Sequence, residues 1–277
     1  MRYGIHLPQF GQASGPDSVR QAAIQAEDLG YDDIWVSDHL AVPKDAQYPP
    51  TAYIHEPLIT LTWAAAATKR VGLGTSILVL PMRRPLVLAK MLSSLDIMSG
   101  ERLIVGAASG WLKEEFDALG VPFNERGKRT DETIALLRAC WTEDPVNFEA
   151  KATGGNFVNM RANPRPNRHI PIWIGGMSNV ALDRAIAVGD GWHASGSNKD
   201  DLGASIARLR AARPEKEFTI STREHWDALE GDVEDMKRQI AKFEEQGVQH
   251  MMFQPRQRYA DDWLRSVELL WEMTQGV

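Results

Sequence analysis

The sequence predicts an α/β protein of a single domain, a (β/α)8 TIM barrel. Eight short apolar segments alternate along the 277 residues with stretches whose apolar residues recur at helical spacing. The length suits one such barrel, and no linker divides the chain. We therefore expect one domain over residues 1–277, with its active site at the carboxyl ends of the strands.

The eight predicted strands are spread over the whole chain. They are residues 3–7, 33–36, 71–80, 103–106, 171–174, 191–194, 218–221 and 249–253. Pro57 and Pro85 each follow a polar residue and suit the first turn of a helix. Gly30 and Gly247 each separate a helical stretch from a strand, where a left-handed helix cap is expected. An open, doubly wound sheet is disfavoured because no Gly-x-Gly-x-x-Gly turn follows the first strand.

Composition excludes several classes of protein. The net charge of −6 argues against a general nucleic-acid binder. No apolar run approaches the roughly 20 residues that cross a bilayer, and the amino-terminal apolar run is too short for a signal peptide. We therefore expect a cytoplasmic protein with no nucleic-acid or membrane partner. The single cysteine, Cys140, lies in a predicted helix and is expected to be a buried, unreactive thiol.

One segment interrupts the alternation of strands and helices. Residues 144–169 are rich in Asn, Gly, Pro and Arg and show no helical pattern. A long excursion in a compact domain is often functional. Two interpretations stay open, a lid over the active site and a two-stranded surface flap.

Residues 71–81 form the most informative predicted strand. Gly72 and Gly74 leave no side chain where another backbone or a flat ligand comes close. A kink at Ser76 and Ile77, followed by Pro81, would turn the end of this strand into a wall for a planar ring. A glycine-rich bulge without a ligand is the simpler interpretation.

A second glycine-rich turn follows the fifth strand. Gly175, Gly176, Met177 and Ser178 directly precede a predicted helix. Glycines that open a helix expose backbone N–H groups to an anion, and the helix dipole favours negative charge. The pattern therefore suits a phosphate site, and it suits a tight strand-to-helix turn equally well.

Asp38 and His39 follow the second strand, where a carboxylate and an imidazole can share a proton or orient a substrate. A histidine held by a structural hydrogen bond is the alternative. The histidines lack metal-ligand spacing, so we expect no metal. Ser109 and Gly110 only approach a Gly-x-Ser-x-Gly nucleophile motif, and no lysine stands at a strand end. These absences suggest that a cofactor carries the chemistry.

Six motifs give the chain a resemblance to a known family. They are residues 26–39, 73–81, 95–103, 110–116, 171–176 and 189–192. With them the chain resembles the bacterial luciferase-like superfamily, most closely its branch that uses the deazaflavin coenzyme F420. The resemblance covers nearly the whole length and implies a (β/α)8 barrel with a flavin-type ring at the carboxyl ends of its strands.

The resemblance also implies roles for individual residues. Ser76 and Ile77 match a non-prolyl cis peptide behind the middle ring of the cofactor, and Asp38 and His39 match residues that face the ring and the substrate. Cofactor contacts are implied for Ser109, Gly110, Gly175, Gly176, Met177 and Ser178, and a substrate pocket for Gln9, Trp111 and Trp192. Arg83 and Arg84 are expected on the surface, with a place near the mouth of the barrel as the alternative.

One position departs from the family pattern. Similar enzymes that act on sugar phosphates carry a Glu directly after the Ser/Thr-Gly pair, and this chain has Trp111 there. The departure removes a proton donor and argues against sugar-phosphate oxidation. An aromatic side chain at this place favours a larger or flatter substrate.

The sequence therefore predicts an F420-dependent oxidoreductase that transfers a hydride between the deazaflavin and a small organic substrate. His39 would donate or accept the proton, and Asp38 would support it. The alternative is an FMN-dependent monooxygenase that uses oxygen and a separate reductase. A cofactor-binding protein without activity is a third possibility. The resemblance also suggests a homodimer.

Overall fold

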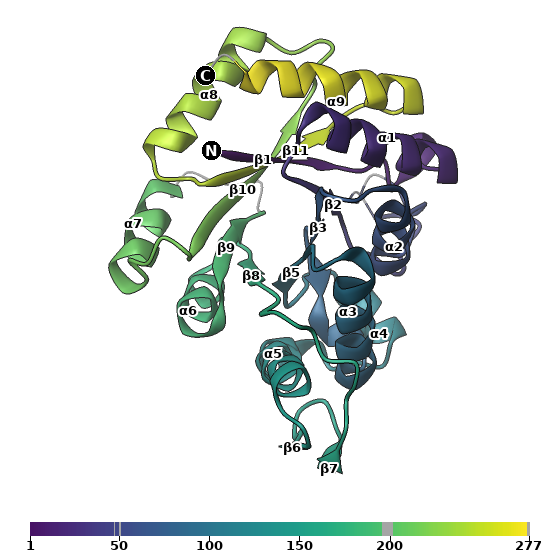
Figure 1. Ribbon diagram of the computed structural model, residues 1–277, viewed down its shortest axis with the longest axis vertical. Coiled ribbons are helices and arrows are strands. Elements are labelled where there is room, and N and C mark those ends of the chain that lie inside the picture. Colours follow the sequence, from purple (N-terminus) through teal and green to yellow (C-terminus); the bar gives the residue numbers. More distant parts are fainter. Residues whose placement is uncertain (47, 50, 196–201, 276–277) are drawn as a thin grey trace.

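The computed structural model describes residues 1–46, 48–49, 51–195 and 202–275. Eight parallel strands close into a barrel, because β1 pairs with β2 on one side and with β11 on the other (Figure 1). Around the barrel the strands are β1 (Arg2–His6), β2 (Asp33–Val36), β3 (Gly72–Thr75), β5 (Leu103–Ala108), β8 (Ile172–Gly175), β9 (Gly191–Ala194), β10 (Thr219–Trp226) and β11 (His250–Pro255). The predicted (β/α)8 barrel is confirmed.

Helices cover the outside of the barrel (Figure 1). They are α1 (Pro16–Leu29), α2 (Pro57–Ala67), α3 (Pro85–Ser99), α5 (Arg126–Thr142), α6 (Asn179–Val188), α7 (Leu202–Ala212), α8 (Val233–Glu245) and α9 (Ala260–Thr274). A short helix, α4 (Lys113–Ala118), follows β5, and three 3-10 turns lie at Gly11–Ala13, Leu80–Met82 and Phe123–Glu125. Pro57 and Pro85 open α2 and α3, as predicted. The described residues contain no helix long and apolar enough to span a bilayer.

The strand predicted at residues 71–80 is divided in two. A cis peptide bond joins Ser76 to Ile77 between β3 and the two-residue strand β4 (Leu78–Val79), as the resemblance implied. β3 pairs with the amino-terminal half of β5, and β4 pairs with its carboxyl-terminal half. The predicted strands at residues 218–221 and 249–253 are also longer in the structure, so Arg223 and His225 lie within β10.

The barrel interior is filled by the protein's own aromatic rings. Trp35 stacks on Trp173 at 5.5 Å between ring centroids and on His193 at 5.3 Å. A Cβ on Gly74 would collide with the Trp35 indole. The flat ring that approaches Gly74 therefore belongs to Trp35 and not to a ligand, which corrects that part of the sequence interpretation.

Residues 144–169 form a two-stranded flap. β6 (Val146–Glu149) and β7 (Asn156–Met160) pair antiparallel beyond α5 (Figure 1). Arg168 Nη2 donates to Asp96 Oδ1 at 2.6 Å and to the Leu103 carbonyl at 2.7 Å. Because Leu103 begins β5, this end of the segment lies at the amino-terminal face of the barrel, opposite the end where the active site is expected.

Cys140 lies buried in α5, as predicted. Burial raises the pKa of its thiol, which keeps the sulfur protonated at neutral pH. Nothing in these surroundings suits a nucleophile.

The predicted left-handed caps are present. Gly30 closes α1 with φ +107°, and Gly247 adopts φ +93° after α8.

We expect Gly30→Ala to lower the free energy of unfolding by about 1–2 kcal/mol, because a side chain is strained at this φ and its Cβ would lie 3.1 Å from Trp271. Gly203→Ala in α7 is the matched control, since its Cβ meets nothing within 3.7 Å, and it should be neutral or stabilising. Denaturant unfolding measures both, and equal shifts would contradict this account.

Candidate active site

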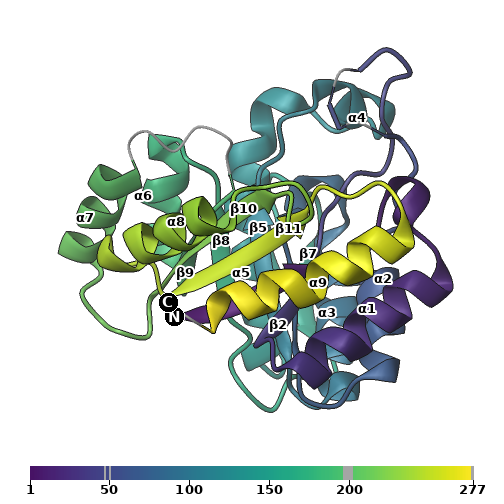
Figure 2. The same ribbon diagram turned by 90° about the horizontal axis from the view of Figure 1, so that it is seen from above.

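His39 is paired with a carboxylate that the sequence interpretation did not assign. Its Nδ1 lies 2.8 Å from Glu115 Oε2, and its side chain is 12% exposed. The other oxygen of Glu115 accepts the backbone N–H groups of Leu40 at 2.7 Å and Ala41 at 3.2 Å. Figure 2 shows α4, which carries Glu115, beside the long connection that follows β2.

The carboxylate of Glu115 is ionised in this arrangement. Burial opposes its charge, but the His39 ring and the two backbone N–H groups outweigh burial and hold the pKa of Glu115 below its ordinary value. An ionised carboxylate only accepts hydrogen bonds. His39 must therefore carry a proton on Nδ1, which leaves Nε2 to exchange protons with a substrate.

An aromatic side chain lies beside the His39 ring, and a second one lies next to the first. Trp111 stands edge-on to it at 5.8 Å and is 53% exposed. Tyr48 lies 5.9 Å from Trp111. The Trp111 ring offers an apolar, flat surface beside the His39 ring, and the Tyr48 ring extends it. Trp111, predicted for the substrate pocket, is placed where it can contact a bound molecule.

The hydrogen bonds of the Asp38 carboxylate go to Arg83 and Val79 and not to His39. Arg83 donates to both oxygens of Asp38, at 2.5 Å and 2.9 Å, and to Glu56 at 2.7 Å. Burial disfavours the guanidinium charge, but the two carboxylates outweigh burial and raise the pKa of Arg83. Asp38 is buried, and it also accepts the Val79 N–H at 2.8 Å. Asp38 therefore fixes the chain after β4, and Arg83 is an internal partner and not the surface residue that was expected.

Ser76 and Ile77 contact an arginine and one other predicted cofactor residue, Gly175. Arg223 donates to the Ser76 carbonyl at 2.6 Å. A Cβ on Gly175 would collide with the Ile77 side chain, so the absence of a side chain at Gly175 makes room for Ile77. The structure thus brings Ile77, which follows β3, against the end of β8.

Hydrogen bonds from neighbouring residues fix the turn at residues 175–178. Gly176 adopts φ +109°, and Ser178 caps α6 by accepting the Ala181 N–H at 3.3 Å. Trp192 donates to the Gly176 carbonyl at 2.7 Å and is completely buried. Trp192 therefore supports this turn and offers no surface to a substrate. Met177 packs against the main core as a partly buried residue.

Three further predicted residues are engaged in contacts within the protein. Thr130 donates to the Ser109 hydroxyl at 3.0 Å, and Gly110 with φ +82° is enclosed by Val79 and Phe116. Gln9 is fully buried, and its amide joins the backbone of Ser37 to that of residue 55. Gln9 thus positions the chain that leads to Asp38 and His39 and is not exposed to a substrate.

Arg223 lies at the candidate site, although the sequence assigned it no role there. Burial lowers the pKa of its guanidinium, although the nearby Tyr48 hydroxyl acts in the opposite direction. Ser221, Arg223 and His225 alternate along β10, and this period of two signals one face of a strand. Three polar residues on one face of a predicted barrel strand are an uncommon pattern, and this pattern could have indicated Arg223 from the sequence. Glu115 is harder to identify from the sequence. Two adjacent glutamates, Glu114 and Glu115, lie in the first turn of α4, and only their tertiary contacts show which one pairs with His39.

A family model described as luciferase-like monooxygenase matches residues 1–264. The F420-dependent glucose-6-phosphate dehydrogenase of Amycolatopsis mediterranei is 33% identical over 195 residues, which cover 69% of this chain and 55% of that protein. The FMNH(2)-dependent dimethylsulfone monooxygenase of Pseudomonas putida is 32% identical over 160 residues, 57% of this chain and 44% of that protein. The chain therefore aligns with about half the length of each of these two relatives.

A solved structure supports the fold independently. An F420-dependent secondary alcohol dehydrogenase, solved with an F420-acetone adduct, superimposes with a TM-score of 0.82 and 19% identity. The match covers 98% of this chain and 97% of that one. At this identity the likeness bears on the fold alone.

Proposed function

Because the chain belongs to the luciferase-like monooxygenase family, we propose that it is an oxidoreductase that transfers a hydride between coenzyme F420 and a small organic substrate. The observation that carries this proposal is the His39–Glu115 pair at the carboxyl ends of the strands. Such a pair can supply or remove the proton that accompanies hydride transfer to a carbonyl or from an alcohol.

Three features of the barrel suit a flat ring with an anionic tail. Ile77 lies in the space that a side chain on Gly175 would fill, at the junction of β3 and β8. The first turn of α6 follows Gly176 and presents backbone N–H groups, which favour phosphate. Gln254, near the carboxyl end of β11, has a buried Oε1 with no hydrogen-bond partner among the described residues. We therefore assign the residues 76–77 and 175–178 to cofactor binding.

When bound, F420 supplies a carbon centre that gives or takes a hydride. His39 holds one proton on Nδ1 toward Glu115 and exchanges a second at Nε2. If Nε2 takes a proton from a substrate hydroxyl, the imidazolium that forms is stabilised by the Glu115 carboxylate. In the reverse direction the imidazolium returns that proton to a carbonyl oxygen. Trp111 and Tyr48 present apolar ring surface beside His39, which favours an apolar substrate.

An FMN-dependent monooxygenase is the second candidate, and the similarity to the Pseudomonas putida enzyme favours it. That function would need oxygen and a separate reductase as partner. The homodimer also stays a proposal. Large apolar side chains exposed on α2 and α3 support it, namely Ile59, Trp63 and Val87.

A parallel titration of the apo-protein with oxidised F420 and with FMN tests the cofactor. We expect F420 to bind at least tenfold more tightly, a difference of about 1.4 kcal/mol. Calorimetry or the fluorescence of the cofactor measures both affinities. Tighter binding of FMN would overturn the F420 assignment and favour the monooxygenase.

A further inference from the structure

Five buried polar side chains form a continuous hydrogen-bonded chain through the inside of the barrel. The Ser76 hydroxyl lies 2.8 Å from His193 Nε2, and His193 Nδ1 lies 2.7 Å from the Ser221 hydroxyl. The same hydroxyl lies 2.7 Å from His250 Nδ1, and His250 Nε2 lies 2.7 Å from Asp33 Oδ1. None of the five side chains is more than 1% exposed.

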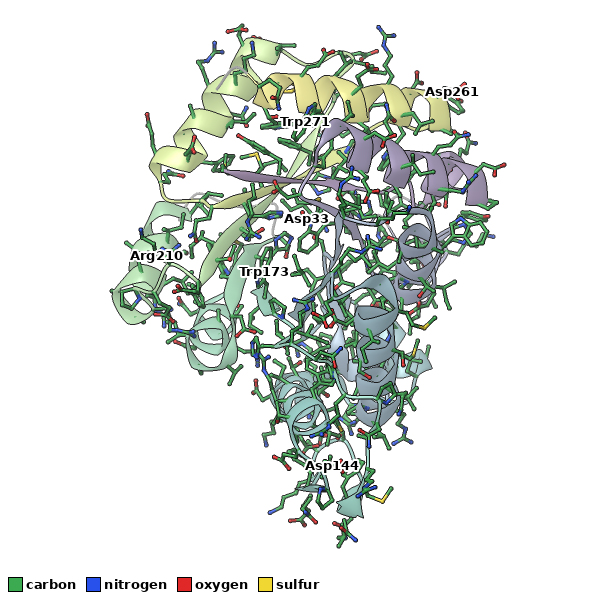
Figure 3. All side chains as sticks on the ribbon, in the orientation of Figure 1. Asp33, Asp144, Trp173, Arg210, Asp261 and Trp271 are labelled. Atoms are coloured by element: carbon green, nitrogen blue, oxygen red, sulfur yellow. The ribbon has the colours of Figure 1, made fainter. Side chains whose placement is uncertain are left out.

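The chain of hydrogen bonds connects opposite ends of the barrel. Ser76 follows the carboxyl end of β3, at the proposed ring site, and Asp33 begins β2, inside the ring of strands (Figure 3). His193, Ser221 and His250 come from β9, β10 and β11, which are neighbours in the sheet. The Trp35 indole stacks on His193 and also contacts His250 at 5.3 Å, so packing fixes both imidazole rings.

The hydrogen bonds have a defined direction. Burial opposes the charge of Asp33, but His250 and the Trp35 N–H outweigh it and hold the pKa of Asp33 below its ordinary value. An ionised Asp33 only accepts, so His250 carries its proton on Nε2 and accepts at Nδ1 from Ser221. Ser221 then accepts from His193 Nδ1, and His193 Nε2 accepts the hydroxyl proton of Ser76. Every group is satisfied with both histidines neutral.

We propose that these five residues are a proton relay, which takes up one proton at Ser76 and holds it as a His250 imidazolium against Asp33. Each step moves one proton. The incoming proton binds Ser76 Oγ, whose own proton passes to His193 Nε2. The Nδ1 proton of His193 passes to Ser221, and the Ser221 proton passes to His250 Nδ1. His193 ends neutral with its proton on Nε2, and no bond other than O–H and N–H changes.

The surrounding charges favour the Asp33 end as the place for the proton. Arg223 donates to the Ser76 carbonyl at 2.6 Å, so a positive charge at Ser76 would be repelled. At the other end the Asp33 carboxylate compensates the imidazolium. The positive charge of Arg2 opposes an imidazolium there, but Arg2 is exposed and solvent screens its charge. His6, in the same interior, stays neutral because burial and Arg223 lower its pKa to about 3. His225 lies beside Arg223, whose Nε is 3.3 Å from His225 Nε2.

Histidine ring 15N spectra of the apo-protein, recorded as the pH is lowered, test the relay without any cofactor. At high pH we expect the ring proton on Nε2 in His250 and on Nδ1 in His193. When His250 becomes protonated, His193 should exchange its proton from Nδ1 to Nε2 with the same midpoint. In Ser221→Ala the two events should separate, while Ser221→Thr, which keeps the hydroxyl, should keep them together.

Ser266→Ala is the matched control, because Ser266 is equally buried and its hydroxyl donates to the Asp262 carbonyl within α9 at 2.9 Å. It should behave as the unchanged protein. Three results would overturn the relay: a His193 proton on Nε2 at high pH, coupled events in Ser221→Ala, or a His250 that stays neutral until the protein unfolds. The relay deepens the proposed function, since it serves the ring site, but these spectra decide it even if neither cofactor binds.

Discussion

Replacing Glu115 by Gln should lower kcat about a hundredfold, a loss of about 2.7 kcal/mol of transition-state stabilisation, with little change in cofactor affinity. The carboxylate accepts from His39 on one oxygen and from Leu40 and Ala41 on the other. A Gln amide has one acceptor oxygen, so its NH2 group must face another donor. A neutral amide also fails to stabilise the imidazolium that proton transfer creates. Steady-state turnover with an accepted substrate, beside a cofactor titration, measures the two effects.

Glu114→Gln is the matched control, because Glu114 is the preceding residue on the same helix and is exposed. It should leave kcat unchanged. His39→Ala should remove turnover while cofactor binding persists, and adding Glu115→Gln to it should cost little more, because the carboxylate acts through His39. Full turnover in His39→Ala, or equal and additive losses in the double variant, would remove the proposed role of the pair.

Replacing Arg83 by Met should lower the free energy of unfolding by about 3–5 kcal/mol, the range found when one member of a buried ion pair is removed. Arg83 neutralises Asp38 and Glu56 together, and Asp38 is only 4% exposed. Without the guanidinium, the Asp38 carboxylate would keep the Val79 N–H but stay buried without a counter-charge. Urea unfolding at neutral pH measures the loss.

Arg84→Met tests whether charge removal alone explains such a loss. Arg84 is the next residue and is exposed. A surface position away from special contacts should change stability by less than about 0.5 kcal/mol. If Arg83→Met and Arg84→Met lowered the free energy of unfolding equally, the buried ion pairs of Arg83 with Asp38 and Glu56 would not explain the loss.

Much of the site could be located from the sequence because strand ends are local features. The apolar run at residues 71–80 and the glycines at 175 and 176 mark where strands stop, and in a barrel all strands stop at the same end. This reasoning placed His39, Trp111 and the residues 76–77 near one another. It could not tell which carboxylate serves which base, since Asp38 and Glu115 both lie within reach of the same loop.

The sequence by itself determined the alternation of strands and helices, the barrel and its left-handed caps, and it predicted the end at which the proposed site lies. Each of these follows from patterns a few residues long, which local backbone preference and periodic burial set. The tertiary structure alone decided the pairings: His39 with Glu115, 76 residues away, Asp38 with Arg83, and the interior chain from Ser76 to Asp33. These depend on which inward-facing side chains meet when the barrel closes, and closure brings together strands that are distant in the sequence.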